Sequence, residues 1–340
     1  MNGNAIFRPQ DTAVLSITAV DAPVVKTSAE FDEIIGDSYG RNGLRPGMLA
    51  ALAGISERRW WDEGYDFVDG AIDAGRAAIA EAGIDHERIG LVVNTSVSRS
   101  YLEPSIAVRV HHELGLATSC LNFDLTNACL GFVNGMQLAA TLIDAGQIDY
   151  ALIVDGEGSR VPQENTLAHL SSADATAEDI LTQFATLTLG SGAAAMVLGR
   201  ASAHPEGHRL VGGVSRAASH HHELCVGDFD KMSTDAQGLL VAGMSLAEDL
   251  WKDAAGEFDW SDMDRYIVHQ VSRVHTSKTA EALGIDKDRI PLTFPTLGNV
   301  GPAAVAITLA KEAAALQRGD RVLMMGIGSG LNMTCLELAW

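Results

Sequence analysis

An internal repeat constrains the fold of this chain more than any other feature of the sequence. Residues 130–156 align without a gap onto residues 301–327, at an offset of 171 positions. A second block, which ends at Arg99, falls on the block that ends at Arg273, at an offset of 174 positions. Two blocks in the same order at nearly the same offset indicate a duplicated structural unit. We therefore predict two related halves, residues 1–200 and 201–340.

Short apolar runs alternate with amphipathic patterns of helix length through both halves. Eight runs are typical of buried strands, namely TAVLSITAV, IGLVVNTSV, CLNFDLT, YALIVDG, AAAMVLG, RYIVHQVS, RVLMMGIG and NMTCLELAW. Strands that alternate with helices predict an α/β fold with largely parallel strands. Residues 155–190 are more polar, and we expect a partly helical insertion there that covers a site or an interface.

Charge and cysteine content exclude several classes of function. The net charge of −20 argues against a nucleic-acid or anionic membrane surface. No run of about 18 apolar residues predicts a membrane span, and no basic and apolar leader is evident at the start. The four cysteines are too widely spaced for a disulfide framework or a Cys-x-x-Cys metal site. We expect a cytoplasmic protein without a bound metal.

Three residues could form a reactive site. Cys129 stands where the run CLNFDLT gives way to a helical pattern, and taken alone it is more typical of a packed core thiol. The repeat places the loop with Asn299 at the matching position, and His269 follows an apolar strand. The helix dipole should lower the pKa of such a cysteine, and a thiolate can carry an acyl group. The histidine and the asparagine can donate hydrogen bonds to an enolate oxygen.

Two further clusters allow more than one interpretation. Residues 220–222 are three histidines in a row, and because adjacent side chains diverge we predict an exposed loop and no metal site. Residues 58–61, Arg-Arg-Trp-Trp, could hold the phosphates and adenine of a CoA, or form an exposed ion-pairing face with partly buried aromatic rings.

Four ordered segments, NACLGF, HQVSR, GNVGPA and GIGSGLN, resemble the signature segments of the thiolase superfamily, in its β-ketoacyl synthase III branch. The resemblance covers nearly the whole chain. It implies a five-layer α-β-α-β-α fold with two halves related by a pseudo-twofold axis, and a homodimer. It also implies that Cys129 is the acylated nucleophile and that His269 and Asn299 activate or stabilise the second acyl group. The backbone N–H groups of Cys129 and Ser329 would form the oxyanion hole, although the family usually has glycine at the second position.

The segment NTSVSRSYLEPS resembles the OleA-type enzymes of bacterial long-chain olefin synthesis. These enzymes join two fatty acyl thioesters without decarboxylation, so the resemblance implies that Glu103, reaching in from the partner subunit, removes the α-proton. The implied substrates are acyl-CoA thioesters, with no metal or redox cofactor, and the implied product is a 2-alkyl-3-oxo acid. The alternatives are a decarboxylating synthase that uses a malonyl thioester, a silent subunit of a heterodimer, and a thioester hydrolase.

Overall fold

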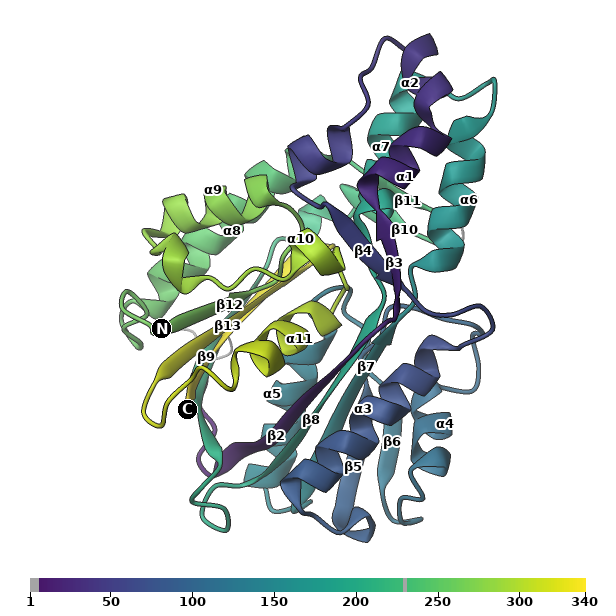
Figure 1. Cartoon of the computed structure of the whole chain (residues 1–340). Helices are drawn as coiled ribbons and strands as arrows, with labels where there is room; N and C mark the ends of the chain where they lie inside the picture. Colours follow the sequence, from purple (N-terminus) through teal and green to yellow (C-terminus); the bar gives the residue numbers. More distant parts are fainter. Residues whose placement is uncertain (1–5, 229–230) are drawn as a thin grey trace.

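Ten strands form one continuous sheet in the computed structural model of the protein, which describes residues 6–228 and 231–340 (Figure 1). The first five residues, part of the stretch in which we predict no leader, lie outside the described residues. The sheet order is β12-β13-β14-β9-β2-β8-β7-β5-β6, with β1 added beside β9. These strands are β1 (Ile6–Phe7), β2 (Thr12–Asp21), β5 (Ile89–Asn94), β6 (Leu121–Asp124), β7 (Tyr150–Glu157), β8 (Gly192–Arg200), β9 (His208–Ala217), β12 (Arg265–Val268), β13 (Arg321–Gly328) and β14 (Asn332–Ala339).

Two antiparallel pairs of strands lie apart from this sheet. They are β3 (Val24–Thr27) with β4 (Glu57–Trp60), and β10 (Cys225–Gly227) with β11 (Met232–Thr234). The α-helices are α1 (Ser28–Ile34), α2 (Gly36–Arg41), α3 (Phe67–Ala82), α4 (Ile106–Glu113), α5 (Gly131–Asp144), α6 (Arg160–Ser171), α7 (Ala177–Thr188), α8 (Ala236–Ala254), α9 (Arg273–Leu283), α10 (Phe294–Leu297) and α11 (Ala303–Glu312).

The strand order repeats within the sheet. In the first part of the chain β2 pairs with β8, β8 with β7, and β7 with β5. In the second part β9 pairs with β14, β14 with β13, and β13 with β12, which is the same order. Strand β7 starts and ends 171 positions before β13, as the sequence repeat predicts. The two sets meet where β2 pairs briefly with β9. Among the described strands of this sheet, three pairings are parallel and six are antiparallel, so the prediction of largely parallel strands is wrong.

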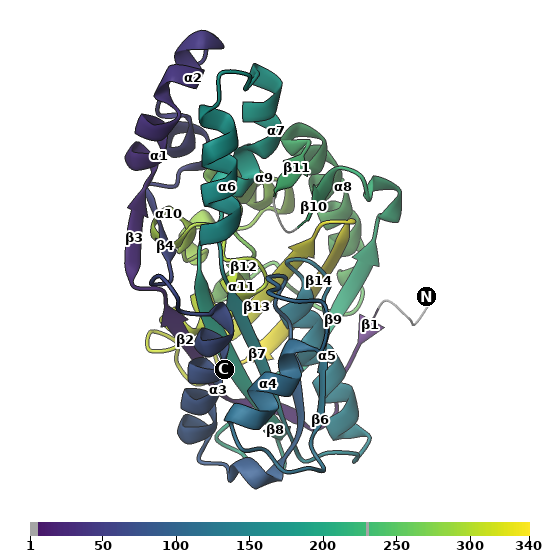
Figure 2. The same ribbon diagram turned by 90° about the vertical axis from the view of Figure 1, so that its right-hand side faces the viewer.

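Five layers result from this arrangement, in the order predicted from the resemblance. Helices α3 and α4 cover the outer face of the β2–β8 set, and α8 and α9 cover the outer face of the β9–β14 set (Figures 1 and 2). Helices α5 and α11 lie between the two sets and contact strands of both. Both inner helices are strongly apolar, because they must bury their surface on two sides.

The predicted insertion at 155–190 begins later than expected, because β7 continues to Glu157. Helices α6 and α7 follow it and pack with α1, α2 and the β3–β4 strand pair around a separate apolar cluster that includes Phe31, Trp60 and Leu187. These elements form a lobe above the layers (Figure 1).

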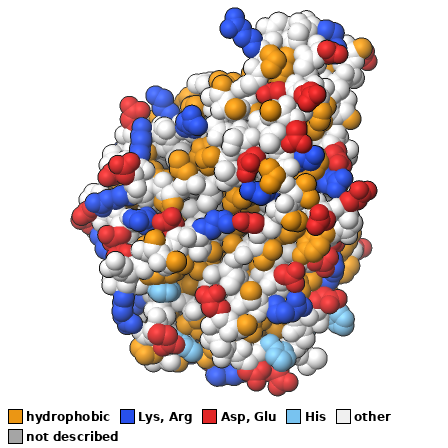
Figure 3. All heavy atoms as spheres, viewed as in Figure 1, with side chains coloured by type: hydrophobic (Ala, Val, Ile, Leu, Met, Phe, Trp, Pro, Cys, Tyr) orange, Lys and Arg blue, Asp and Glu red, His pale blue; other side chains and the backbone are white. Residues whose placement is uncertain are grey.

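The charge distribution on the surface and the composition of the helices bear on the predicted lack of nucleic-acid and membrane partners. Acidic and basic side chains are interspersed over the face in Figure 3, with no extended basic patch on that face. Within residues 6–228 and 231–340, no helix is both long enough and apolar enough to cross a lipid bilayer. The cytoplasmic location stays a prediction.

Candidate active site

A tight turn presents Cys129 between the end of β6 and the start of α5. Ala128, which precedes it, has a φ of 45°, a left-handed conformation that is uncommon for a residue with a side chain. No side chain caps the first turn of α5, and the Gly131 N–H, the first of the helix, donates to the Ala128 carbonyl of the turn at 3.3 Å. A Cβ added at Gly328 would lie 2.7 Å from the Asn127 carbonyl oxygen. The glycine is therefore needed to bring the Gly328–Ser329 backbone against the Cys129 turn.

The Cys129 thiol is not activated in the way that its position near a helix start suggests. Burial, followed by the charge of Glu157, raises the pKa of the Cys129 thiol to about 12, while its own backbone N–H opposes the shift. The expectation of a lowered pKa is therefore wrong for this state of the protein. Desolvation of the thiolate outweighs the helix dipole here. Cys129 is a neutral thiol at rest.

His269 directly follows β12 and is 9% exposed. Its backbone N–H donates to the Met325 carbonyl of β13 at 2.8 Å, which fixes the residue at the end of the sheet. The ring Nδ1 is buried and meets no hydrogen-bond partner within the described part of the chain. Burial lowers the pKa of His269 to about 4, with a smaller contribution from His275. The imidazole is therefore neutral at pH 7, with one N–H to donate.

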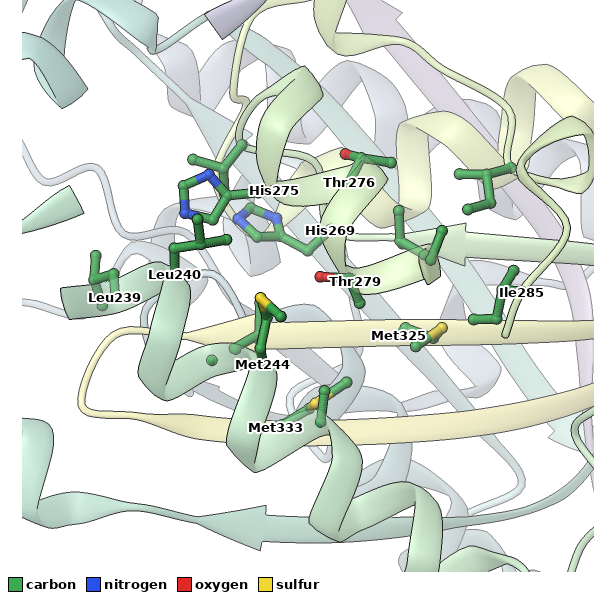
Figure 4. Close-up of a pocket in the computed structure, with 17 residues that line it drawn as sticks. Leu239, Leu240, Met244, His269, His275, Thr276, Thr279, Ile285, Met325 and Met333 are labelled. Atoms are coloured by element: carbon green, nitrogen blue, oxygen red, sulfur yellow. The ribbon is translucent and has the colours of Figure 1, made fainter. Parts of the chain in front are cut away.

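An apolar cavity of about 80 Å³ adjoins His269 between α8, α9 and the ends of β12, β13 and β14 (Figure 4). His269 and His275 lie side by side at one end of it, and the side chains of Met244, Met325 and Met333 line its length. Methionine side chains are flexible and fill irregular space, so such a wall can adapt to an apolar guest. The cavity is suited to a hydrocarbon chain.

Asn299 lies in the loop between α10 and α11 and is 8% exposed. Its N–H donates to the Thr188 carbonyl at 2.8 Å, and its own carbonyl accepts from the Gly190 N–H at 2.9 Å. Its side-chain oxygen accepts from the Gly301 N–H at 3.1 Å. These bonds fix both the backbone and the amide. No acceptor for the amide nitrogen is found among residues 6–228 and 231–340, so this group can donate to a ligand.

Two buried carboxyl groups that we did not predict lie beneath the Cys129 and Asn299 loops. Asp155 and Glu157 project from the same face of β7, two residues apart. A Cβ added at Gly301 would lie 3.3 Å from the Glu157 carboxyl carbon. A usable signal was present in the sequence, because two acidic residues end an otherwise apolar strand.

Glu103 lies apart from these groups within the chain. It is exposed, between β5 and α4, and its neighbour Leu102 is 82% exposed. Asp124, at the end of β6, accepts from the Ile106 and Ala107 N–H groups at 2.9 Å and 3.0 Å. It also pairs with Arg99 at 3.1 Å. The loop that carries Glu103 is thus fastened beside the end of β6.

Neither of our two interpretations of residues 58–61 describes most of this segment. Arg58 is fully buried and donates to the Ser28 hydroxyl at 3.1 Å and to the Leu187 carbonyl at 3.0 Å. The indole N–H groups of Trp60 and Trp61 bond to Gln163 and to the Glu157 carbonyl. These residues hold the lobe on the sheet. Only Arg59 pairs with an acid at the surface, Glu57.

Residues 220–222 lie in a short exposed turn, where the rings of two of the histidines stand 4.0 Å apart. In the part of the chain that the structure describes, no three His, Cys, Asp or Glu side chains are arranged to hold a metal ion.

Known proteins match this architecture over almost its full length. Residues 123–217 match the 3-oxoacyl-[acyl-carrier-protein] synthase III family, and residues 254–340 match the C-terminal family of the same enzymes. A Xanthomonas campestris protein named acyl-CoA:acyl-CoA alkyltransferase is 43% identical over 97% of this chain and 99% of its own. A Shewanella oneidensis protein of the same name is 36% identical over 94% of this chain and 96% of its own.

A solved structure is similarly close. It is a Cys→Ser variant of Xanthomonas campestris OleA, described with bound lauric acid and lauroyl-CoA. It is 42% identical, with a TM-score of 0.95 over 98% of this chain and 100% of its own. Sequence and fold therefore agree on the same relatives.

Proposed function

The chain belongs to the family of acyl-CoA:acyl-CoA alkyltransferases, which are related to the 3-oxoacyl synthases III, and we propose that it joins two acyl-CoA molecules without decarboxylation. The observation that carries this proposal is the 43% identity to such an alkyltransferase along nearly the whole chain. Two acyl-CoA molecules and one water give one 2-alkyl-3-oxo acid and two free CoA molecules. We place this reaction in the cytoplasm, in long-chain olefin synthesis, as the resemblance implies.

Acylation of Cys129 is the first step. Its sulfur attacks the thioester carbon, the bond from that carbon to the CoA sulfur breaks, and the thiol proton ends on the departing CoA. The backbone N–H groups of Cys129 and Ser329 stabilise the oxyanion during the attack. The close packing of Gly328 on the Cys129 turn supports this pairing, because it brings the two backbones together. Serine at position 329 leaves the backbone N–H available.

Carbon–carbon bond formation is the second step. Glu103 of the other subunit removes the α-proton of a second acyl-CoA, because no carboxylate is available to leave as CO₂. The neutral His269 ring and the Asn299 amide donate hydrogen bonds to the enolate oxygen. The carbanion attacks the acyl carbon on Cys129, the bond from that carbon to the sulfur breaks, and the proton taken up by Glu103 returns to the released thiolate. Hydrolysis of the remaining CoA thioester then releases the β-keto acid. The low pKa of His269 supports its role, since a neutral ring donates a bond without trapping the enolate as an enol.

The apolar cavity beside His269 supports hydrocarbon substrates. An acyl chain that lies in this cavity, next to His269, would hold its thioester group close to the histidine that stabilises the enolate. Each methylene that moves from water into such a cavity contributes about 0.8 kcal/mol to the free energy of substrate binding. We propose that this cavity receives part of an acyl chain.

A homodimer is the second part of the proposal. Strand β6 ends the sheet, and one of its edges has no pairing strand within residues 6–228 and 231–340. Unpaired edges of this kind join a second copy readily. Leu121, which begins β6, is 52% exposed. Because the Glu103 loop is fastened to the end of β6, a second copy that pairs along this edge would receive Glu103 near its own site.

One assay separates this function from decarboxylating condensation, which the name of the matched family favours. The enzyme is incubated with lauroyl-CoA alone, and CoA release and β-keto acid are measured. We expect two CoA per β-keto acid, and no product from a Cys129→Ala variant. If lauroyl-CoA alone gives no product but an added malonyl thioester restores turnover, the proposed function is wrong. Release of free lauric acid alone would indicate a hydrolase, and absence of an acyl adduct on Cys129 would indicate a silent subunit.

Mixing of subunits tests the dimeric site. Cys129→Ala and Glu103→Gln proteins are each inactive if both residues are needed. After exchange in a 1:1 mixture, half of the dimers are mixed, and each mixed dimer has one complete site out of two. We therefore expect about a quarter of the wild-type activity to return. If Glu103 acts within its own chain, the mixture stays inactive.

A further inference from the structure

Asp155 and Glu157 are buried acids whose charges act on Cys129, and the proposed mechanism does not use them. Both side chains are buried and point from β7 toward the inner helices. Burial of two carboxyl groups side by side is costly unless they are hydrogen-bonded and share a proton. Their partners decide where that proton resides.

Glu157 is surrounded by donors. It accepts from the Val97 N–H at 2.7 Å, the Ser98 N–H at 3.1 Å and the Ser98 hydroxyl at 2.5 Å. A carboxylate that accepts several hydrogen bonds is stabilised in its ionised form. Burial raises the pKa of Glu157, and the bonds from Ser98 and Val97 offset part of that rise. Glu157 is the ionised member.

Asp155 has a different environment. One of its oxygens accepts from the Thr95 hydroxyl at 2.5 Å. The other, Oδ1, is fully buried and meets no N–H or O–H donor in the described residues. The Asp155 and Glu157 side chains leave the same face of β7, and burial followed by the charge of Glu157 raises the pKa of Asp155. A proton on Asp155 would satisfy both groups at once, because Asp155 would donate to Glu157.

The contacts of the pair reach all three loops of the proposed site. Thr95, which Asp155 holds, packs against the start of α5, where a Cβ added at Gly131 would lie 2.8 Å from the Thr95 carbonyl oxygen. Gly131 follows Cys129 by two residues. Glu157 meets Gly301, whose N–H orients the Asn299 amide.

Glu157 also fixes Val97 and Ser98 at the start of the Glu103 loop. We propose that Asp155 and Glu157 form a one-proton carboxyl pair, with the proton on Asp155, that positions the Cys129 turn, the Asn299 loop and the base of the Glu103 loop. They are positioning residues, since they act through the loops. The link to activity rests on the proposed function, whereas the link to Cys129 does not.

The assignment of the proton predicts opposite outcomes for two isosteric variants. In Asp155→Asn, the amide oxygen still accepts from Thr95 and the amide N–H₂ still donates to Glu157. In Glu157→Gln, one carboxylate oxygen becomes an N–H₂ that faces the Val97 or Ser98 N–H, so two donors oppose each other. We expect Asp155→Asn to keep condensation of lauroyl-CoA within about twofold of wild type, and Glu157→Gln to lose at least about tenfold.

Alkylation of Cys129 supplies a measurement that a merely structural role would not change in the same direction. Glu157→Gln removes the nearest negative charge, so iodoacetamide should label Cys129 at a lower pH than in wild type, although condensation falls. The other charged or titratable groups that interact with this cluster are Arg99, which faces Asp155, and Cys225, which faces Cys129; both stay unchanged in every variant. Mass spectrometry maps the labelled cysteine, and the labelling rate of Cys129 is compared between the variant and wild type at each pH from 6 to 10.

Three results would overturn the inference. The first is a loss in Asp155→Asn as large as in Glu157→Gln, and the second is the reverse order of the two variants. The third is a rate of Cys129 labelling in Glu157→Gln that is equal to or lower than the wild-type rate at the same pH. If Glu157→Gln does not fold, the activity of Asp155→Asn alone tests the inference. A loss beyond about twofold in that variant would contradict the placement of the proton on Asp155. If wild type itself makes no β-keto acid, the proposed function fails and the labelling comparison still tests the pair.

Discussion

Replacement of Gly243 by alanine should make the protein more stable and shorten the acyl chain that it prefers. Gly243 lies inside α8 and lines the cavity beside His269. A Cβ added there would lie 3.4 Å from the Ile327 Cδ1 atom, which is ordinary van der Waals contact, so the methyl group fits. Alanine in a helix interior is favoured over glycine by about 1 kcal/mol. The free energy of unfolding should rise by about that amount.

The same methyl group occupies space in a cavity of only about 80 Å³. If one methylene of the substrate can no longer enter, about 0.8 kcal/mol of binding is lost. That loss corresponds to about a fourfold lower kcat/KM for the longest chain that wild type accepts. Shorter acyl-CoA substrates should be unaffected.

The assay is a series of saturated acyl-CoA substrates, compared in wild type and variant, together with thermal unfolding. Gly40→Ala is a matched control, because Gly40 lies in α2 with nothing within 4 Å of an added Cβ. The control should leave the chain-length profile unchanged. A stabilised Gly243→Ala with the wild-type profile would refute the assignment of this cavity to the acyl chain.

Three further predictions follow from the geometry. Glu103→Gln should still form the acyl-enzyme but lose condensation by at least about a hundredfold, and equal loss of both steps would contradict its role as base. Gly190→Ala would place a Cβ 1.8 Å from the Leu297 carbonyl oxygen, so we expect a loss of about 3 kcal/mol in unfolding free energy. Gly256→Ala, which meets nothing within 4 Å, should not share that loss. Because the pKa of Asp155 is raised on folding, the folded protein holds a proton that the unfolded chain releases above about pH 4. Wild-type stability should therefore fall by about 1.4 kcal/mol per pH unit relative to Asp155→Asn between that pH and the raised pKa, and parallel stability curves would contradict the shared proton.

Much of the architecture could be predicted because buried strands leave a strong sequence pattern. The runs assigned to β7 and β13 are apolar throughout, and their spacing also gave the repeat. Strand β9 was missed because Gly212 and Gly213 interrupt its apolar pattern. The structure explains the second glycine, since a Cβ there would lie 2.3 Å from the Cys335 carbonyl oxygen. Close pairing with β14 requires a residue that sequence patterns associate with turns.

The environment of the site was harder to predict than its residues. The positions of Cys129, His269 and Asn299 at turns and strand ends follow from local patterns and from the repeat. The raised pKa of Cys129 depends instead on burial and on Glu157, which is distant in sequence. The spacing of sequence motifs does not show which distant residues bury a side chain or place a charge beside it. The same holds for the bonds between Glu157 and the Val97–Ser98 backbone.

A pulse and chase on the acyl-enzyme tests the central claim most directly. Enzyme is acylated with lauroyl-CoA labelled with ¹³C at the carboxyl carbon, freed of excess substrate, and then given unlabelled acyl-CoA. The account predicts an acyl adduct on Cys129 and a β-keto acid whose label lies at the 3-oxo carbon, so the derived ketone keeps the label after loss of CO₂. Label that leaves as CO₂, or product formed without an adduct on Cys129, would contradict it.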